Sequence, residues 1–436
     1  MIKVFFLVIF ITINLYGNKK DYKFENRQTI YLVDFIKRLL VENPTINEQF
    51  HFLESLQRDI NISNAAFLPT IDLNYKYTDY SKSSVDKFTD TTSKDITLRY
   101  NIFNGFEDSL NQKVVQSNYD TNIHLKNQIE SDLIYSLTEA FITIQKQKDI
   151  LELARKNLDD YDQWVKKEDI KFKNDLVSLR EYAKVQSRDT IQRMNFEELK
   201  KQYNDSIFTF QKYLDFNKEE IAYFEKLTPH SKYLDNKDIA YETSLSLSPY
   251  IQEAKANVVL SKDKMKQERV HFYPKVDLVG KVSRLDENYE NRVADENKDK
   301  YVALEAKLNF YSGGKDKSTY EKRLSEYRQK IKKRDEVILD VKYKVNLSFS
   351  KYEFFLKKDK FLLHLIKKRE ESYLGATYDY KFAKIDADIL LDAVDDLYDA
   401  KKQYITNKYD LQAVQYEILN NIGVIKNHIL EDRVKE

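Results

Sequence analysis

The chain of 436 residues contains no cysteine, only 7 glycines and only 5 prolines. The absence of cysteine excludes disulfide bonds, thiol catalysis and a lipid-modified N-terminal cysteine. Glycine and proline are the residues that most often interrupt regular structure, and residues 106–228 contain neither. The sequence therefore predicts long, uninterrupted helices.

The chain also lacks an excess of charge of one sign. Its 72 Lys and Arg residues almost balance 71 Asp and Glu residues, and the formal net charge is +1. Proteins that bind nucleic acid usually carry a basic surface with a clear net charge. The composition therefore predicts no nucleic-acid partner.

Long hydrophobic runs are absent except at the N-terminus. There Lys3 precedes an apolar run over residues 4–15, followed by Tyr16 and Gly17. This order is typical of a secretory signal peptide, which we assign to residues 1–17, with an N-terminal membrane anchor as the alternative. Beyond it no segment approaches 18 apolar residues, so any membrane-spanning part of the mature chain is predicted to be β.

Four of the five prolines reveal an internal duplication. Pro44 and Pro69 are 25 residues apart, as are Pro249 and Pro274, and the second pair is displaced from the first by 205 residues. A fixed displacement near half the chain length indicates a duplicated structural unit.

Further along the chain the displacement becomes 208. Ile102-Phe103-Asn104-Gly105 then matches Phe310-Tyr311-Ser312-Gly313. The predicted organisation is a signal peptide (1–17), a first repeat (18–214), a linking segment (215–247), a second repeat (248–423) and a C-terminal tail (424–436).

Each repeat contains two segments of alternating apolar and polar residues, predicted as β-strands at about 69–80, 95–104, 274–285 and 300–311. About ten residues suit a tilted transmembrane strand with a lipid face and a wet face, although a half-buried sheet of a soluble domain alternates in the same way. The polar links 81–94 and 286–299 are predicted as surface loops. We expect the wet face to line a water-filled lumen with Asp72, Lys76, Arg99, Asp277, Lys281, Glu305 and Lys307.

Four strands cannot close a barrel, and an open edge in hydrocarbon would leave backbone groups unpaired. The chain must therefore oligomerise. Two copies would supply eight strands and three copies twelve, with a wider interior.

The predicted helices have matching lengths. A helix over about 105–171 would be about 100 Å long, and the helices predicted over 44–67 and 176–214 together come close to that length. Residues 249–272, 313–380 and 384–422 repeat the arrangement. The predicted object is a tube much longer than a bilayer is thick.

The ordered set of segments resembles the TolC-type outer-membrane efflux protein family, also called outer membrane factors. The resemblance rests on the Asn-Pro helix start, the Leu-Pro strand start, the Phe-Asn-Gly turn and the duplicated layout. The most specific segment resembles the family's helix-turn-helix tip: it runs from Tyr380-Lys381-Phe382-Ala383 through Leu391-Asp392-Ala393 and is followed by Leu397-Tyr398-Asp399-Ala400. Its counterpart in the first repeat is Phe172-Lys173-Asn174-Asp175-Leu176-Val177-Ser178.

The resemblance implies a mainly α fold with a membrane β-barrel part, with four long helical strands and four β-strands in each chain. It further implies a homotrimer in which a twelve-stranded β-barrel in outer-membrane lipid continues as a twelve-helix periplasmic tunnel. Such a protein is a passive exit duct of a Gram-negative bacterium. Its periplasmic tip docks a periplasmic adaptor and an inner-membrane transporter and opens by untwisting of the helices.

The chain departs from the family at the tip. Glycine is common in the family's tip turns, whereas Asp175 and Ala383 stand there, so we expect the second turn to differ in detail. Tyr380 and Asp392 match residues of the family's closing network, but Ile385 and Ile389 stand where an Arg and an Asp are found. We therefore expect a different closing network.

An acidic stripe follows the second tip turn, with Asp388, Asp392, Asp395 and Asp399 on one helix face. It is either a solvated face relieved by neighbouring lysines or a ring of acid at the pore entrance that favours cations. We assign the periplasmic gate to Tyr380, Asp388, Asp392 and Asp395. We assign adaptor docking to Phe172, Asn174, Asp175, Ser178, Ala383 and Asp386.

The sequence shows no constellation for catalysis, a cofactor or a metal, because its 6 histidines have no paired spacing and no phosphate-binding glycine loop is present. A cell-surface coiled-coil scaffold and a simple diffusion porin are the alternatives to a duct. Drug efflux, metal efflux and protein secretion by a type I system use similar ducts, and the choice between them lies in the transporter.

Overall fold

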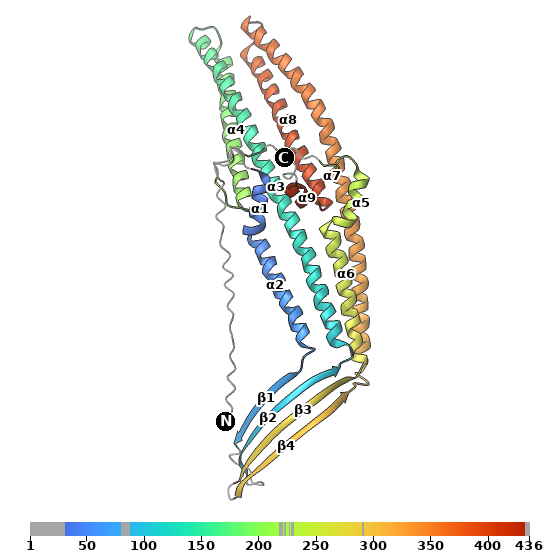
Figure 1. The fold of residues 1–436 in the computed structure, drawn as a ribbon. Coiled ribbons are helices and arrows are strands. Elements are labelled where there is room, and N and C mark those ends of the chain that lie inside the picture. The colour runs from blue at the N-terminus through green and yellow to red at the C-terminus, as the bar shows by residue number, and fades with distance from the viewer. Residues whose placement is uncertain are drawn as a thin grey trace.

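The structure is a computed structural model and describes residues 31–79, 88–217, 221, 224, 225, 227, 231–289 and 292–431. It is elongated, with a β-sheet at one end and helices extending from it (Figure 1). Helices α3 (Glu107–Lys173) and α7 (Lys315–Lys381) contain 67 residues each. At 1.5 Å per residue each is about 100 Å long, so they reach from the sheet to the far end, here called the tip.

The sheet consists of four antiparallel strands in the order β1-β2-β3-β4. Their bounds are β1 Thr70–Asp79, β2 Phe88–Phe103, β3 Lys275–Tyr289 and β4 Arg292–Lys307. β2 and β3 join the two repeats by direct pairing, with Ile96 opposite Val282. The duplicated units therefore form one continuous sheet.

The strands differ from the sequence-based bounds at the hairpin ends. β2 begins at Phe88 and β4 at Arg292, so much of the predicted loops 81–94 and 286–299 is paired strand. The ladder uses backbone groups and does not need apolar side chains, which is why polar residues continue it. β4 ends at Lys307, not at 311, because β3 begins at Lys275 directly opposite.

Both long helices begin at a left-handed turn. Gly105 and Phe106 precede α3 with φ of 70° each, and Gly313 and Gly314 precede α7 with φ of 68° and 82°. A Cβ atom on Gly105 would lie 2.6 Å from Cβ of Tyr273, so no larger residue fits. The matching turns repeat the geometry that carries each strand into its helix.

Shorter helices complete each repeat. Pro44 and Pro249 occupy the first turns of α2 (Pro44–Ala65) and α6 (Pro249–Gln267), where a missing N–H is harmless. A 3₁₀ turn, η2 (Glu268–Phe272), follows α6. The tip hairpins are completed by α4 (Leu179–Gln211) and α8 (Ala387–Asn421).

Three further helices lie outside the predicted set: α1 (Leu32–Glu42), α5 (Lys237–Leu247) and α9 (Ile425–Glu431). α1 and α5 each end one residue before the asparagine or serine that precedes a repeated proline. α1 has apolar residues at helical spacing, Leu32, Phe35, Ile36 and Leu39, so a local signal for it was present in the sequence. α5 and α9 are short helices of 11 and 7 residues without such a signal.

The main hydrophobic core lies midway along the helices, where residues of the linking segment and of α9 join it. Phe35 of α1 packs edge-on against Phe210 at 5.2 Å, and Phe141 stacks on Phe224 at 4.4 Å. Ile425 of α9 is fully buried in the same cluster. The linking segment and the tail therefore meet around the middle of α3.

Among the described residues, no helix is both long enough and apolar enough to cross a membrane.

Candidate functional site at the helical tip

The tip consists of two helical hairpins, α3–α4 and α7–α8 (Figure 1). Each turn contains one non-glycine residue with positive φ, Asp175 at 58° and Ala383 at 54°. The turns therefore share their backbone shape. They differ in their caps, because Ser178 and Glu181 form a reciprocal capping box on α4, whereas the Asp386 side chain makes no cap hydrogen bond on α8.

A buried hydrophobic cluster holds the two hairpins together. It contains Tyr161 of α3, Val185 of α4, Tyr380 of α7, and Leu390 and Leu391 of α8. All four tip helices contribute, so separating the hairpins would expose this cluster.

Arg188 of α4 binds three carboxylates of the acidic stripe on α8. Its Nε lies 2.8 Å from Asp388, its Nη2 lies 2.6 Å from Asp392, and its Nη1 lies 3.3 Å from Asp395. Lys184, one turn earlier, lies 3.0 Å from Asp388. We call these five side chains the Arg188 cluster.

Asp395 accepts two further hydrogen bonds besides its ion pair with Arg188. The hydroxyl of Tyr161 donates to its Oδ1 at 2.6 Å, and the amide of Gln192 donates to the same oxygen at 2.9 Å. Burial raises the pKa of Asp395, and its neighbours on the stripe act in the same direction. In contrast, hydrogen bonding from Lys184 lowers the pKa of Asp388, and the Arg188 charge adds to the effect.

Tyr380 lies apart from the Arg188 cluster and joins α7 to α3. Its hydroxyl donates to Glu168, whose side chain is 2% exposed. Lys171 pairs with Glu168 at 3.0 Å and places its ammonium 3.9 Å from the centre of the Tyr380 ring. Burial raises the pKa of Tyr380, so the hydroxyl remains a donor at neutral pH.

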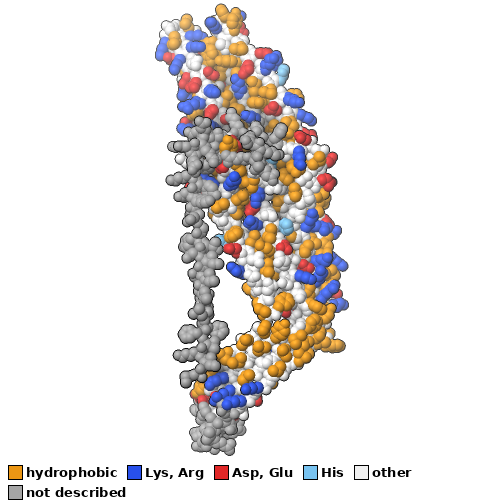
Figure 2. Space-filling view, in the orientation of Figure 1, with side chains coloured by type: hydrophobic (Ala, Val, Ile, Leu, Met, Phe, Trp, Pro, Cys, Tyr) orange, Lys and Arg blue, Asp and Glu red, His pale blue; other side chains and the backbone are white. Residues whose placement is uncertain are grey.

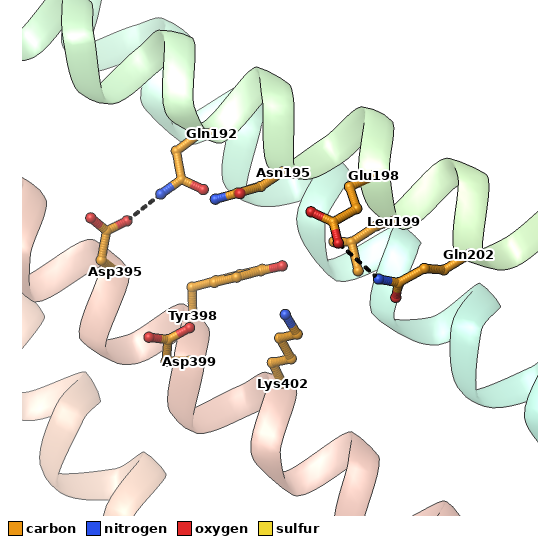
Figure 3. Close-up of a pocket in the computed structure, with 9 residues that line it drawn as sticks. All are labelled: Gln192, Asn195, Glu198, Leu199, Gln202, Asp395, Tyr398, Asp399 and Lys402. Carbon is orange, nitrogen blue, oxygen red and sulfur yellow. Dashed lines mark hydrogen bonds between the residues drawn. The ribbon is translucent and has the colours of Figure 1, made fainter.

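A pocket of about 310 Å³ adjoins the Arg188 cluster between α4 and α8. Figure 3 shows Tyr398 extending from α8 toward α4. Burial and the nearby carboxylates raise the pKa of Tyr398 to about 12. The lining is mostly polar: Gln192, Asn195, Glu198, Leu199, Gln202, Asp395, Tyr398, Asp399 and Lys402.

The residues predicted for the gate therefore lie in two separate groups of contacts. Asp388, Asp392 and Asp395 meet at one arginine, whereas Tyr380 contacts Glu168. The residues predicted for docking lie at or next to the two turns, and the Phe172 ring stacks on Tyr182 at 4.4 Å. The residues of the tip that were not predicted from the sequence are Arg188, Lys184, Tyr161, Glu168 and Lys171.

The residues predicted for the lumen share one face of the sheet by strand register. Arg99 lies 3.3 Å from Asp277 and 3.2 Å from Glu305, joining three strands. Lys281 pairs with Asp95 at 3.2 Å. Asp72, Lys76 and Lys307 belong to the same face by alternation.

Within the part of the chain that the structure describes, no group of three or more His, Asp or Glu side chains is arranged to hold a metal ion.

Comparison with known proteins agrees with this architecture. A model of the outer membrane efflux protein family matches residues 35–214 and 240–424. No curated protein matches the sequence.

Solved structures share the fold at low sequence identity. The Campylobacter jejuni CmeC outer membrane channel is 11% identical with a TM-score of 0.78, covering 90% of this chain and 86% of that one. The Vibrio cholerae outer membrane protein VceC is 12% identical with a TM-score of 0.77, covering 90% and 96%. The Neisseria gonorrhoeae MtrE outer membrane channel, in its open state, is 14% identical with a TM-score of 0.69, covering 90% and 89%.

The fold and the family match to both repeats define a protein of the outer-membrane efflux class. The chain belongs to the outer membrane efflux protein family, also known as the TolC family. It is a protein of the Gram-negative outer membrane that extends into the periplasm.

Proposed function

We propose that the chain forms the passive outer-membrane exit duct of a tripartite efflux pump or a type I secretion system. The observation that carries the proposal is the direct continuation of a two-faced sheet into two 67-residue helices. One face of the sheet is apolar and exposed and the other holds ionic side chains. A sheet of this kind suits lipid on one side and water on the other.

We propose that three copies assemble, because β1 and β4 are edge strands with one paired side each. Three four-stranded sheets would close a twelve-stranded barrel and remove these edges. Exposed apolar side chains on α2 and α7 support the same assembly: Phe50, Phe52 and Ile62 on α2, and Leu339, Tyr343 and Leu347 on α7. These faces would pack between neighbouring copies as a twelve-helix tunnel.

We propose that the described tip is the closed state of the duct. The Arg188 cluster and the Tyr380 contact each join one hairpin to the other. Opening would separate the hairpins by breaking these polar contacts. The structure of MtrE in its open state supports the idea that a protein of this fold can open.

We propose that docking of a periplasmic adaptor at the two turns, with an inner-membrane transporter behind it, drives this separation. The proposed docking residues lie at the two turns. The α3–α4 turn contributes Phe172, Asn174, Asp175 and Ser178, and the α7–α8 turn contributes Ala383 and Asp386. The duct itself would use no energy source. Its gate residues would be Tyr380, Asp388, Asp392 and Asp395, together with their partners.

The first test is whether the protein extracted from the outer-membrane fraction runs as a heat-modifiable trimer. The proposal expects a trimer that dissociates only on heating. A soluble monomer would support the coiled-coil scaffold instead. A trimer that conducts without any response to changes at the tip would support a simple diffusion porin.

A further inference from the structure

The residue types on the outer face of the sheet change along the strands. Residues that lie opposite one another on neighbouring strands form a row across the sheet, and the rows nearer the helices are apolar. In one of them Ile71 lies opposite Leu98, and in the next Leu73 lies opposite Ile96, which lies opposite Val282. Ile71 and Leu73 are 70% and 76% exposed in the single chain. Figure 2 shows hydrophobic side chains over this part of the sheet. The proposed function places this belt in the hydrocarbon of the membrane.

The next row away from the helices is basic. Tyr75 lies opposite Lys94, Lys94 opposite Arg284, and Arg284 opposite Lys298. Lys300 adds a fourth cation at the edge of the preceding row, opposite Val282. Figure 2 shows Lys and Arg side chains gathered at this end of the sheet. We call Lys94, Arg284, Lys298 and Lys300 the basic rim.

The polar face carries charges of both signs at this height. Asp95 and Asp299 alternate with Lys94 and Lys298 along the strands, so they belong to the polar face. There Asp95 pairs with Lys281 at 3.2 Å, and Lys76 lies nearby opposite Ser93. The outer row of Lys94, Arg284 and Lys298, in contrast, contains no acidic residue.

The acidic residues of the outer face lie farther from the helices than the basic rim. Asp286 occupies the following row, where it accepts from Arg284 at 2.8 Å and lies 3.9 Å from Lys94. Asp79 and Asp90 face each other one row beyond. The order along the outer face is therefore an apolar belt, then basic side chains, then acidic ones.

We propose that the basic rim binds the phosphate groups of a glycolipid in the outer leaflet. This inference rests on the proposed function, which sets the apolar belt in lipid. The layer adjoining membrane hydrocarbon contains the headgroup phosphates, and the rim lies at that depth. Neighbouring strands are about 4.8 Å apart, so Lys94, Arg284 and Lys298 span about 10 Å, which suits a headgroup with two phosphates. Each basic residue near an anionic lipid surface strengthens binding by about fivefold.

The test uses the trimer in nanodiscs of zwitterionic phospholipid with a small fraction of diphosphorylated glycolipid or of the same glycolipid without phosphates. Glycolipid that remains with the protein after detergent extraction and chromatography is counted by mass spectrometry. Wild type is expected to retain at least tenfold more of the phosphorylated form, because two or more rim cations at about fivefold each act together. The variant K94Q/R284Q/K298Q/K300Q is expected to lose this preference.

The matched control K317Q/K322Q/K330Q/K332Q removes the same charge from exposed positions of α7 and is expected to behave as wild type. If the quadruple variant K94Q/R284Q/K298Q/K300Q does not assemble, the single variants Lys94→Gln and Lys298→Gln are expected to lose part of the preference for the phosphorylated glycolipid. Equal retention of both glycolipids by wild type would overturn the proposal. A quadruple variant that still prefers the phosphorylated glycolipid would overturn it as well. Displacement of the glycolipid by millimolar inorganic phosphate would also overturn it, because it would indicate a simple anion site. Trimer formation and conductance are measured on the same preparations, so a failure of the duct proposal is seen separately.

Discussion

At the scale of single residues, the acidic stripe of α8 is balanced by basic residues of α4. Carboxylates spaced by three and four residues on one helix repel each other by a few tenths of a kcal/mol per pair. At the repeat displacement of 208, Arg180, Lys184 and Arg188 correspond to Asp388, Asp392 and Asp396. The two copies of this helix thus carry opposite charges, and they meet at the tip, where Arg188 binds the stripe.

The closed tip is expected to respond to pH in two opposite steps. Burial raises the pKa of Asp395, so the closed tip binds that proton more tightly than an open tip with an exposed carboxyl. Acidification from neutral pH through this raised pKa toward the ordinary value of 3.8 therefore favours closure. Below 3.8 the lowered pKa of Asp388 has the reverse effect, since its protonation removes stabilisation of the closed tip.

Open probability in a planar bilayer across this pH range measures both steps. The variant Asp395→Asn is expected to lose the closing step and keep the opening step at lower pH. Identical curves for the variant and wild type between neutral pH and about pH 4 would contradict the role of Asp395.

Tyr380→Phe is expected to destabilise the tip by about 1–2 kcal/mol, because it takes one hydrogen bond from the buried carboxylate of Glu168. Protease cleavage at the tip turns, measured against time, reports the loss as faster nicking. Tyr378→Phe is the control, since Tyr378 is exposed on the same helix and should change little. Equal nicking rates in the two variants would show that the Glu168 contact is unimportant.

At the scale of elements, the turn that carries each strand into its long helix tolerates different changes in the two repeats. Gly105 and Gly313 have nearly the same φ, so alanine at either position is strained by about 1 kcal/mol. A Cβ added at Gly105 would in addition clash with Tyr273, whereas no atom lies within 4 Å of a Cβ added at Gly313. Gly105→Ala is therefore expected to reduce the yield of trimer in the outer-membrane fraction much more than Gly313→Ala. Equal yields would mean that the contact with Tyr273 adjusts freely.

The sequence predicted the long helices and the strands because each rests on a local signal. Absence of glycine and proline marks α3, and alternation after Pro69 and Pro274 marks β1 and β3. Strand length was underestimated, because backbone pairing continues through the polar residues 88–94 and 292–299. The short helix α1 has apolar residues at helical spacing and was predictable from the sequence, whereas α5 has no comparable stripe and depends on packing against distant residues.

The Arg188 cluster was missed for a different reason. The sequence prediction offered only neighbouring lysines as partners of the stripe on α8, although the partner, Arg188, lies on α4. Arg188 precedes Asp392 by 204 residues, which is close to the repeat displacement. Comparing the two repeats would have shown that α4 and α8 carry opposite charges, but not which residues pair, because Arg188 aligns with Asp396 at the displacement of 208 and binds Asp388, Asp392 and Asp395 instead.

At the scale of the whole molecule, the sheet, the helices and the tip act at different depths along one long axis (Figure 1). The proposed assembly sets the sheet in the outer membrane, the middle core along the helices and the closing contacts at the periplasmic end. The ion pairs between the hairpins are partly exposed, and such pairs contribute about 0.5 kcal/mol each. The proposed opening would break these weak pairs and would also have to separate the buried cluster of Tyr161, Val185, Tyr380, Leu390 and Leu391.

The central claim is that Arg188 holds a closed duct, and single-channel conductance of the trimer in a planar bilayer tests it most directly. Arg193→Gln is the matched control, because Arg193 lies on the same helix but joins α4 to Asp162 of α3 within one hairpin. Arg188→Gln is expected to raise open probability about tenfold, since three pairs at about 0.5 kcal/mol are lost, while Arg193→Gln stays near wild type. An unchanged open probability in Arg188→Gln, or an equal rise in both variants, would contradict the account.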